Sequence, residues 1–384
     1  MRKIKILRIL HRASVSGPTH HAAILHEYFN NDEYDSLLLV GSCLDSEANG
    51  EYILRDRQLQ YSLLPISREF SLLNEIMAVY QIIKAIIVFK PDIIHTHASK
   101  PGFYGRLLGK FLGVKVLIHT FHGHVFHSYF GYFKTKFIRS VEMFLAYIST
   151  KLVVISEQQH SEIKKYIGCH TKFILIPLGL DLDKYFHSEI LNRKKFRLQY
   201  DLSDKFCIGY SGRLTTIKDI PFFLDVAELI LSEVPGRIKF VISGGGEEEN
   251  SILERITKSK ILSGNVILIG WQKNMEFFYH GIDCLFLTSK NEGTPVSIIE
   301  AICAGVECVS LDVGGVKDIF RNTSSGVLVP NRDARYFVTK FFECVDINCT
   351  MRLDIGKRNL CLLNYGVSKL TSSLDLLYRN LLHS

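Results

Sequence analysis

The chain has 384 residues, of which 47% are hydrophobic and 22% charged, with a formal net charge of +7. This composition excludes disordered and collagen-like chains, and the length predicts two or three globular domains, each with its own core. The nine cysteines include no Cys-x-x-Cys pair, so we expect free thiols in a reducing cytoplasm rather than disulfides or a structural zinc site.

The first ten residues predict a strand, because they lack the long apolar region and cleavage site of a signal peptide. The N-terminal half then alternates β-rich runs with helix-length segments. Strands are expected at 5–10, 36–40, 93–97, 115–120 and 152–155, and helices at 19–29, 72–89, 102–111, 134–148 and 157–166. The apolar stretch 76–89 is shorter than a membrane span and is interrupted by Lys84, so we interpret it as a buried helix.

The pattern stops at 174–186, which we interpret as a linker because it contains Pro177 and Gly179, and then it begins again. Strands are expected at 206–210, 238–243, 266–269, 283–287 and 307–310, and helices at 220–231, 247–259, 296–304, 335–345 and 367–382. Apolar strands that alternate with helices are typical of a parallel sheet covered on both faces. The sequence therefore predicts an α/β protein with two Rossmann-like, doubly wound domains facing across a cleft. These are residues 1–180 and 181–364, and the terminal helix, 365–384, is expected to pack back toward the first.

Basic residues are concentrated in one region. Between Ser99 and Lys172 there are eleven lysines and arginines but only three glutamates, a local net charge of +8, which leaves −1 for the rest of the chain. Such a basic face favours an anionic partner, which could be a phosphate, a nucleic acid or a membrane surface.

Two glutamates eight residues apart form the most specific motif. Glu292 precedes Gly293, Thr294 and Pro295, and Glu300 lies inside the apolar helix that follows. Proline is favoured at the start of a helix, and the free N–H groups there attract an anion. We expect Glu300 to accept hydrogen bonds from vicinal hydroxyls such as those of a ribose. Its apolar neighbours disfavour the alternative of a glutamate that only faces solvent.

Two more loops follow predicted strands. Arg213 and Lys218 come after the strand at 206–210, where their cations could hold a diphosphate, although a solvated loop can have the same sequence. Gly244 begins a run of three glycines, which permits either a close approach of the backbone to a ligand or a tight turn. The run matches neither the dinucleotide-binding fingerprint nor a P-loop.

Histidines follow two strands of the first half. His95 and His97 end one predicted strand, and His122 and His124 follow the next. No carboxylate or cysteine completes a metal-ligand set near either pair, so we expect no metal and instead a histidine that donates a hydrogen bond to a sugar hydroxyl. The Asp-x-Asp at 181–183 has the spacing of metal-dependent transferases, but it lies in the linker and is interpreted as structural.

Together these blocks resemble the retaining enzymes of glycosyltransferase family 4, which have the GT-B fold, across essentially the whole chain. The matching blocks are His95 to Lys100, His119 to His124, Pro177 to Asp181, Gly212 and Arg213 with Lys218, Glu292 to Glu300, and Asp312 to Gly315. The resemblance implies that Glu300 binds the nucleotide ribose and that Arg213 and Lys218 bind the diphosphate.

The resemblance also assigns the donor sugar to Glu292 and to the backbone of Gly293, Thr294 and Pro295, with His122 near the reacting carbon. Gly17 would approach the diphosphate, although the family often has two glycines where this chain has Ser16 and Gly17. We count Gly244 among the donor-binding residues, and His122, Arg213, Lys218 and Glu292 as catalytic.

The implied reaction is front-face transfer with retention, without metal or cofactor, in which the leaving phosphate takes the acceptor's proton. A double displacement with Glu292 as nucleophile stays open. The resemblance favours a UDP-linked hexose or N-acetylhexosamine as donor and a glycan or lipid-linked acceptor for a surface polysaccharide such as capsule or lipopolysaccharide. A nucleotide-sugar 2-epimerase of the same architecture is the alternative enzyme. A nucleic-acid-binding protein is disfavoured, because no such motif occurs.

The segment 129–139 interleaves aromatic with basic residues, including Lys134, Lys136 and Arg139. Rings settle among lipid head groups and cations meet anionic lipid, so the segment favours peripheral contact with the inner face of a membrane. The alternative is that the aromatic side chains are core and the lysines line a solvated helix.

Overall fold

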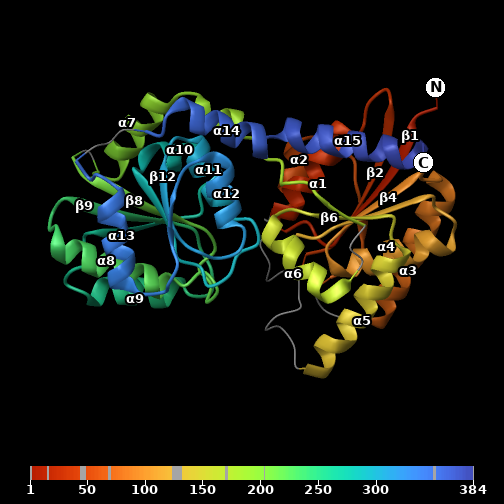
Figure 1. Cartoon of the computed structure of the whole chain (residues 1–384), viewed down its shortest axis with the longest axis horizontal. Helices are drawn as coiled ribbons and strands as arrows, with labels where there is room; N and C mark the ends of the chain where they lie inside the picture. Colours follow the sequence, from red (N-terminus) through yellow and green to blue (C-terminus); the bar gives the residue numbers. More distant parts are fainter. Residues whose placement is uncertain are drawn as a thin grey trace. The chain divides into compact units, whose positions relative to one another are not determined.

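The computed structural model describes residues 2–14, 17–43, 49–67, 71–122, 132–168, 172–202, 204–348 and 352–383, without the side chains of 132–134 (Figure 1). The chain forms two compact units. The first unit comprises Met1–Leu180 with Val367–Ser384, and the second comprises Asp181–Gly366. Each unit is built on one parallel β-sheet, so the predicted α/β class is confirmed.

The first unit contains a seven-stranded sheet in the order β3-β2-β1-β4-β5-β6-β7. Its strands are β1 (Ile4–Leu10), β2 (Tyr34–Gly41), β3 (Ser62–Leu64), β4 (Ile93–His97), β5 (Val116–Thr120), β6 (Lys151–Val154) and β7 (Phe173–Leu175). Alternate side chains of β1 enter different cores: Ile6 packs with one helix layer, and Leu7 and Ile9 pack with the other. Helices therefore cover both faces of the sheet.

The helices of the first unit are α1 (Gly17–Tyr28), α2 (Glu51–Asp56), α3 (Leu72–Phe89), α4 (Ser99–Phe111), α5 (Tyr132–Ile148), α6 (Glu157–Ile167) and α15 (Val367–His383). α1 and α15 cover one face of the sheet, where Ile24 and Leu377 belong to one apolar cluster. α3 and α4 cover the other face, where Ile82 and Leu108 belong to a second cluster (Figure 1). The strand order reverses between β1 and β4, so the loops after these two strands open at a topological switch point.

Two expectations for this unit are wrong. Only 22% of the residues of α3, the segment expected as a buried helix, are buried. By length and composition this helix could cross a membrane. Its inner side packs on the sheet through Ala78, Ile82 and Ile86, while its outer side is exposed and also apolar. The expected linker at 174–186 is shorter, because its first residues pair with β6 as part of β7 and its last ones form the 3-10 helix η2 (Asp183–Phe186).

The second unit contains a six-stranded parallel sheet in the order β10-β9-β8-β11-β12-β13. Its strands are β8 (Phe206–Ser211), β9 (Ile238–Ser243), β10 (Val266–Gly270), β11 (Cys284–Leu287), β12 (Glu307–Leu311) and β13 (Val327–Val329). Its helices are α7 (Glu189–Gln199), α8 (Ile220–Glu233), α9 (Glu249–Lys258), α10 (Met275–Gly281), α11 (Val296–Cys303), α12 (Val316–Thr323), α13 (Ala334–Cys344) and α14 (Ile355–Tyr365). Phenylalanines such as Phe223, Phe240 and Phe286 fill the core on one side of the sheet. Here the order reverses between β8 and β11, and the loops that follow them carry Arg213, Lys218 and the residues from Glu292 to Pro295.

Candidate active site

The Glu292 carboxylate is the centre of the polar cluster in the second unit. Its Oε1 accepts a hydrogen bond from Lys218 Nζ at 2.6 Å and another from Ser289 Oγ at 2.6 Å. The side chain is only 9% exposed, so the lysine compensates a largely buried charge. The glutamate and the lysine, 74 residues apart in sequence, thus meet as an ion pair at the switch point.

The backbone around Glu292 is held by the loop after β12. Gly315 N donates to the carbonyl of Gly293 at 2.6 Å. Gly314 has a φ of +55°, and a Cβ on it would lie 2.0 Å from the Glu292 carbonyl oxygen. Only glycine fits there, so the Asp312–Gly315 block positions Glu292 and Gly293.

The loop after β8 is anchored by Asp219. This carboxylate is 2% exposed and accepts from Arg332 Nε at 2.6 Å. The backbone N–H of Lys290 donates to the carbonyl of Ile217 at 2.8 Å, which ties the loop to the one after β11. Arg213 on the same loop is exposed and has no ion pair among the described residues, so its guanidinium is open to a phosphate.

Gly244 is required by its close contact with this loop. It has a φ of +147°, and a Cβ on it would lie 1.8 Å from the Gly212 carbonyl oxygen. The turn after β9 therefore packs backbone against backbone beside Arg213. Its role in donor binding stays a prediction.

The start of α11 presents free donors. Pro295 is the N-cap residue and no side chain caps the helix, so its first N–H groups face outward with the positive end of the helix dipole. The Thr294 hydroxyl is buried and has no partner among the described residues. Inside the helix, Glu300 Oε2 accepts a hydrogen bond from Tyr279 OH at 3.1 Å. Burial raises the pKa of Glu300, and the nearby Lys184 acts in the opposite direction.

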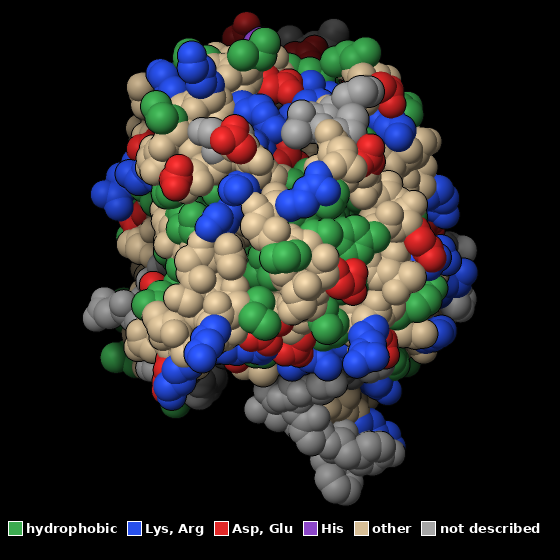
Figure 2. Space-filling model, turned by 90° about the vertical axis from the view of Figure 1, so that its left-hand side faces the viewer, with side chains coloured by type: hydrophobic (Ala, Val, Ile, Leu, Met, Phe, Trp, Pro, Cys, Tyr) green, Lys and Arg blue, Asp and Glu red, His purple; other side chains and the backbone are tan. Residues whose placement is uncertain are grey.

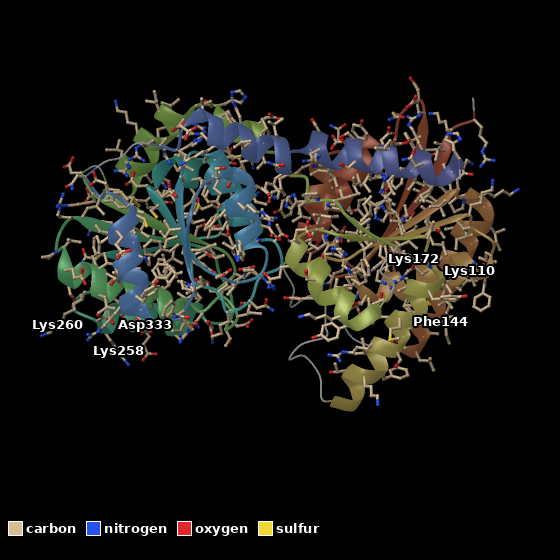
Figure 3. All side chains as sticks on the ribbon, in the orientation of Figure 1. Lys110, Phe144, Lys172, Lys258, Lys260 and Asp333 are labelled. Atoms are coloured by element: carbon tan, nitrogen blue, oxygen red, sulfur yellow. The ribbon has the colours of Figure 1, made fainter. Side chains whose placement is uncertain are left out.

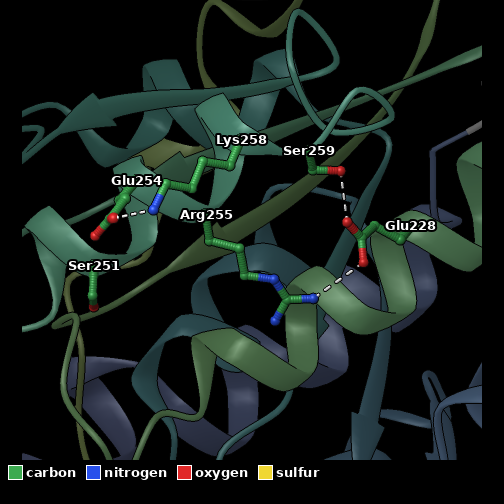
Figure 4. A pocket seen from close by; sticks show the side chains of 6 residues that line it. All are labelled: Glu228, Ser251, Glu254, Arg255, Lys258 and Ser259. Carbon is green, nitrogen blue, oxygen red and sulfur yellow. Dashed lines mark hydrogen bonds and ion pairs between the residues drawn. The ribbon is translucent and has the colours of Figure 1, made fainter.

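A shallow hollow between α8 and α9 in the second unit has charges that satisfy one another. It is lined by Glu228, Ser251, Glu254, Arg255, Lys258 and Ser259 (Figure 4). Arg255 Nη2 lies 3.2 Å from Glu228 Oε2, and Ser259 Oγ donates to the other oxygen of that carboxylate at 2.7 Å. None of the predicted site residues lines it.

Three histidines from different segments meet at the switch point of the first unit. His97 Nδ1 and His122 Nε2 are 3.1 Å apart and share a hydrogen bond. The His21 ring, from α1, has its centroid 4.9 Å from that of His122 and 5.5 Å from that of His97. Neither ring nitrogen of His21 has a partner among the described residues. The sequence placed His122 here but missed His21. Its position soon after Gly17, in the first turns of the helix that follows β1, was the available signal.

A buried arginine lies beneath these histidines. Arg8 is fully buried and its Nη1 donates to Tyr378 OH at 3.1 Å. Because arginine only donates, the tyrosine hydroxyl donates onward to His95 Nδ1 at 2.6 Å, and His95 Nε2 then donates to Thr120 Oγ1 at 2.7 Å. The terminal helix α15 thereby fixes a neutral His95 next to the histidine cluster.

The histidine cluster could hold a metal by geometry. One ring nitrogen each of His21, His97 and His122 lies within 4.8 Å of the others, and three neutral imidazoles are a known zinc ligand set. However, burial lowers the pKa of His21 and His97, with smaller contributions from the neighbouring histidines and from the Arg8 guanidinium. A positive charge such as that of Arg8 disfavours an imidazolium and also disfavours a divalent cation. No carboxylate joins this set in the described residues. A metal-free reaction therefore stays our prediction.

Two family models match the chain: Glycosyltransferase Family 4 over residues 15–184, and Glycosyl transferases group 1 over residues 192–358. The chain is a family 4 glycosyltransferase. It is 26% identical, over 98% of its length and 97% of the relative's, to the UDP-Gal:alpha-D-GlcNAc-diphosphoundecaprenol alpha-1,3-galactosyltransferase of Escherichia coli. It is 25% identical, over 74% of its length and 75% of the relative's, to the capsular polysaccharide biosynthesis glycosyltransferase CapM of Staphylococcus aureus.

Solved structures establish the fold of the glycosyltransferase as GT-B. HepE of Anabaena, in complex with UDP, superposes with a TM-score of 0.82 at 16% identity, over 98% of this chain and 100% of that one. The enzyme class predicted from the sequence is thus confirmed, and these relatives give no support to the epimerase alternative.

The glycosyltransferase brings its predicted residues together in two groups. Lys218, Glu292 and the Gly293 backbone form one network in the second unit, with Arg213 on the same loop as Lys218. Gly17 begins α1, the helix that carries His21. His124 and the residues 129–131 lie outside the described residues.

The lowered pKa values of the buried histidines predict that the folded glycosyltransferase loses stability in acid. Burial lowers the pKa of His122 and of His26 to about 4, and lowers those of His21, His95 and His97 well below the usual value. Below pH 6.5 the unfolded chain takes up protons that the folded one does not, so this stability is present above pH 6.5 and is lost as the pH falls toward 4. Each such histidine contributes about 1.4 kcal/mol per pH unit in that window.

Chemical unfolding at pH values between 7.5 and 4.5 measures this slope, with His26→Gln as the matched variant. His26 lies outside the histidine cluster, where its ring contacts Ser36 Oγ at 2.9 Å and the Gln60 carbonyl at 2.8 Å, and an amide can replace both contacts. We expect the slope to fall by about one histidine's share in the variant. An unfolding free energy that does not change with pH would contradict the assignment of neutral buried imidazoles.

Proposed function

We propose that this glycosyltransferase moves a hexose or N-acetylhexosamine from a UDP-linked donor to a glycan or lipid-linked saccharide in the synthesis of a cell-surface polysaccharide. The names of the two relatives, one acting on a diphosphoundecaprenol acceptor and one in capsule synthesis, support this substrate class. The HepE structures with UDP and with UDP-glucose support a uridine donor. The observation that carries the proposal is the Lys218–Glu292 pair beside the uncapped start of α11.

The donor site that we propose uses charges and free donors of the second unit. Arg213 and Lys218 bind the diphosphate, and Glu300 accepts hydrogen bonds from the ribose hydroxyls. Glu292, together with Gly293, Thr294 and Pro295, binds the hydroxyls of the sugar. The unpaired Thr294 hydroxyl and the outward N–H groups of α11 are the groups that a sugar would satisfy.

In the proposed reaction the anomeric carbon–oxygen bond to the diphosphate breaks while the acceptor hydroxyl attacks from the same side, with retention. The lysine and arginine stabilise the negative charge that develops on the leaving diphosphate, which takes the proton of the acceptor hydroxyl. His122 binds the sugar near the reacting carbon. His97 positions it, because their shared hydrogen bond fixes the ring orientation. Glu292 as a nucleophile is disfavoured, since its Oε1 is already shared by Lys218 and Ser289.

We place the enzyme in the cytoplasm, at the inner face of the plasma membrane. The reason is that a lipid-linked saccharide acceptor stays in the bilayer. No nucleic-acid partner is proposed. The test is a panel of UDP-, GDP-, ADP- and dTDP-sugars offered with and without a membrane lipid extract, with the released nucleotide measured. We expect UDP release that depends on the extract. Epimerised donor, or nucleotide release that the extract does not change, would contradict the transferase reaction with this substrate class.

We predict that the transfer reaction survives thorough chelation. Lys218 and Arg213 supply the cations that a metal would otherwise provide, and the Arg8 charge disfavours a metal among the histidines. The initial rate after dialysis against EDTA should equal the untreated rate within experimental error. A loss that zinc or manganese restores would instead assign a metal role to His21, His97 and His122 or to the exposed Asp181 and Asp183.

A further inference from the structure

The outer side of α3 is an exposed apolar surface. Leu73, Ile76, Tyr80 and Ile87 recur at helical spacing, Val88 comes directly after Ile87, and each of the five side chains is at least 56% exposed. The opposite side of the helix, with Ala78, Ile82 and Ile86, packs on the sheet. A surface helix needs only one apolar side to pack on its own core. The second apolar side of α3 therefore indicates a contact surface.

The helices next to α3 continue this surface. α4 contacts both α3 and α5. Phe111 at the end of α4 is 79% exposed, and Phe144 and Tyr147 of α5 are 54% and 75% exposed. Figure 3 shows Lys110 and Phe144 at the surface of the first unit. We call the exposed sides of α3, α4 and α5, with Leu73, Ile76, Tyr80, Ile87, Phe111 and Phe144, the docking face.

The charges of the docking face have one sign. The only acidic residues of these helices, Glu75 and Glu142, are buried and pair with Lys100 and Arg106 inside the unit. Lys84, Lys110 and Lys136 are exposed and form no ion pair in the part of the chain that the structure describes. In contrast, the face of the second unit in Figure 2 carries basic and acidic side chains interspersed.

Arg139 belongs to the basic segment that is expected at the membrane from the sequence, but its side chain contacts another helix of the protein. The Arg139 guanidinium stacks on the Tyr166 ring of α6 at 4.0 Å. It therefore binds within the protein, while Phe137 and Lys136 on the same helix are exposed. The surface that the structure offers is centred on α3, which the sequence had assigned to the core.

From the apolar stripe and the unpaired lysines we infer that the docking face binds an anionic lipid bilayer, with α3 lying in the plane of the interface. This inference rests on the proposed function, because a lipid-linked acceptor requires the enzyme at a membrane. Leucine and isoleucine side chains enter the acyl boundary, and the rings of Tyr80 and Tyr147 suit the head-group level. The lysines meet anionic lipid head groups.

Co-sedimentation with vesicles of phosphatidylglycerol and phosphatidylethanolamine tests this inference, with phosphatidylcholine vesicles as the neutral reference. The full chain should pellet with the anionic vesicles and less as salt rises. Ile76→Gln with Tyr80→Gln should lower the partition coefficient at least about tenfold. Replacing Lys84, Lys110 and Lys136 by glutamine should lower it about a hundredfold at low salt. These side chains are exposed, so the variants should keep the melting temperature of the parent.

The matched control is Ile190→Gln with Leu198→Gln on α7 of the second unit, where both side chains are more than three-quarters exposed. It should pellet like the parent. Equal pelleting of the docking-face variants and the parent, or no pelleting of the parent, would overturn the inference. The inference would also be overturned if the docking-face variants differed from the parent in sedimentation coefficient without vesicles but bound vesicles equally. The docking face would then join two copies of the chain.

Calorimetric binding of UDP to the same proteins separates this inference from the proposed function. All variants should bind UDP like the parent, since no docking-face residue belongs to the donor site. If the parent pelleted but did not bind UDP, the proposed function would fail and the docking face would stand.

Discussion

Replacement of Lys218 by methionine is expected to lower kcat by about a hundredfold to a thousandfold. The lysine is proposed to stabilise the diphosphate as it leaves, and loss of one preorganised group at such a charge costs a rate of this order. In the structure its Nζ lies 2.6 Å from Glu292 Oε1, so the variant also leaves a largely buried carboxylate without its cation. The measurement is UDP release under saturating donor and acceptor.

Three further variants are compared with Lys218→Met. Lys218→Arg keeps the charge and should recover part of the rate. Lys290→Met removes a neighbouring lysine that is half exposed and lies 3.9 Å from Asp219 rather than Glu292. It should change kcat less than about threefold, because Asp219 keeps its closer ion pair with Arg332 at 2.6 Å and a long pair from a half-exposed lysine is worth little. Arg213→Ala, which removes the other proposed cation, should resemble Lys218→Met. A Lys218→Met enzyme as active as the parent would contradict the role of this lysine.

Replacement of Glu300 by glutamine is expected to weaken UDP binding by one to two decades. A hydrogen bond to a charged group is worth roughly 1.5–3 kcal/mol, and the ribose would lose two charged acceptor oxygens. Glu276→Gln is the control, because this carboxylate also lies near Lys184, at 3.6 Å, but does not accept from Tyr279. Equal UDP affinity of Glu300→Gln and the parent would make the ribose assignment wrong.

The pH dependence of the same pair tests the ionisation of Glu300. Burial raises the pKa of this carboxyl, so the ionised form is lost as the pH falls from neutral toward the raised pKa. The affinity ratio of parent to Glu300→Gln should therefore shrink as the pH falls. Titration of the UDP phosphate affects the affinity of both proteins equally and therefore cancels in this ratio.

The two doubly wound sheets could be predicted because short β-rich runs alternate with helix-length segments in both halves of the chain. Residues 93–97 and 238–243 form strands with the bounds that the sequence predicts, because each run begins with isoleucine and is followed by a helix-length segment. The position of the loops that we propose for the donor could be predicted too, because Arg213 and Glu292 come soon after predicted strands and parallel strands end at one edge of a sheet.

The histidine cluster could not be predicted in full. His21 belongs to α1 and meets His97 and His122 only because β1 and β4 are neighbours at the switch point, a pairing that the sequence does not specify. The contact of Arg8 with Tyr378 joins residues 370 apart and depends on how the terminal helix returns to the sheet.

The exposure of α3 was mispredicted for a related reason. Its leucines and isoleucines are spread around the whole helix, and periodicity alone cannot tell a helix enclosed by protein from one with a second apolar contact. Short elements such as β13 and α10 also lacked a signal, because three to seven residues are too few for a period to emerge.

A crystal structure of the glycosyltransferase with UDP and an unreactive UDP-sugar analogue tests the central claim most directly. The account predicts the diphosphate on Arg213 and Lys218, the ribose hydroxyls on the Glu300 carboxylate, and the sugar against Glu292 and the first N–H groups of α11. A nucleotide bound away from the loops after β8 and β11, or a diphosphate held without Arg213 and Lys218, would contradict it.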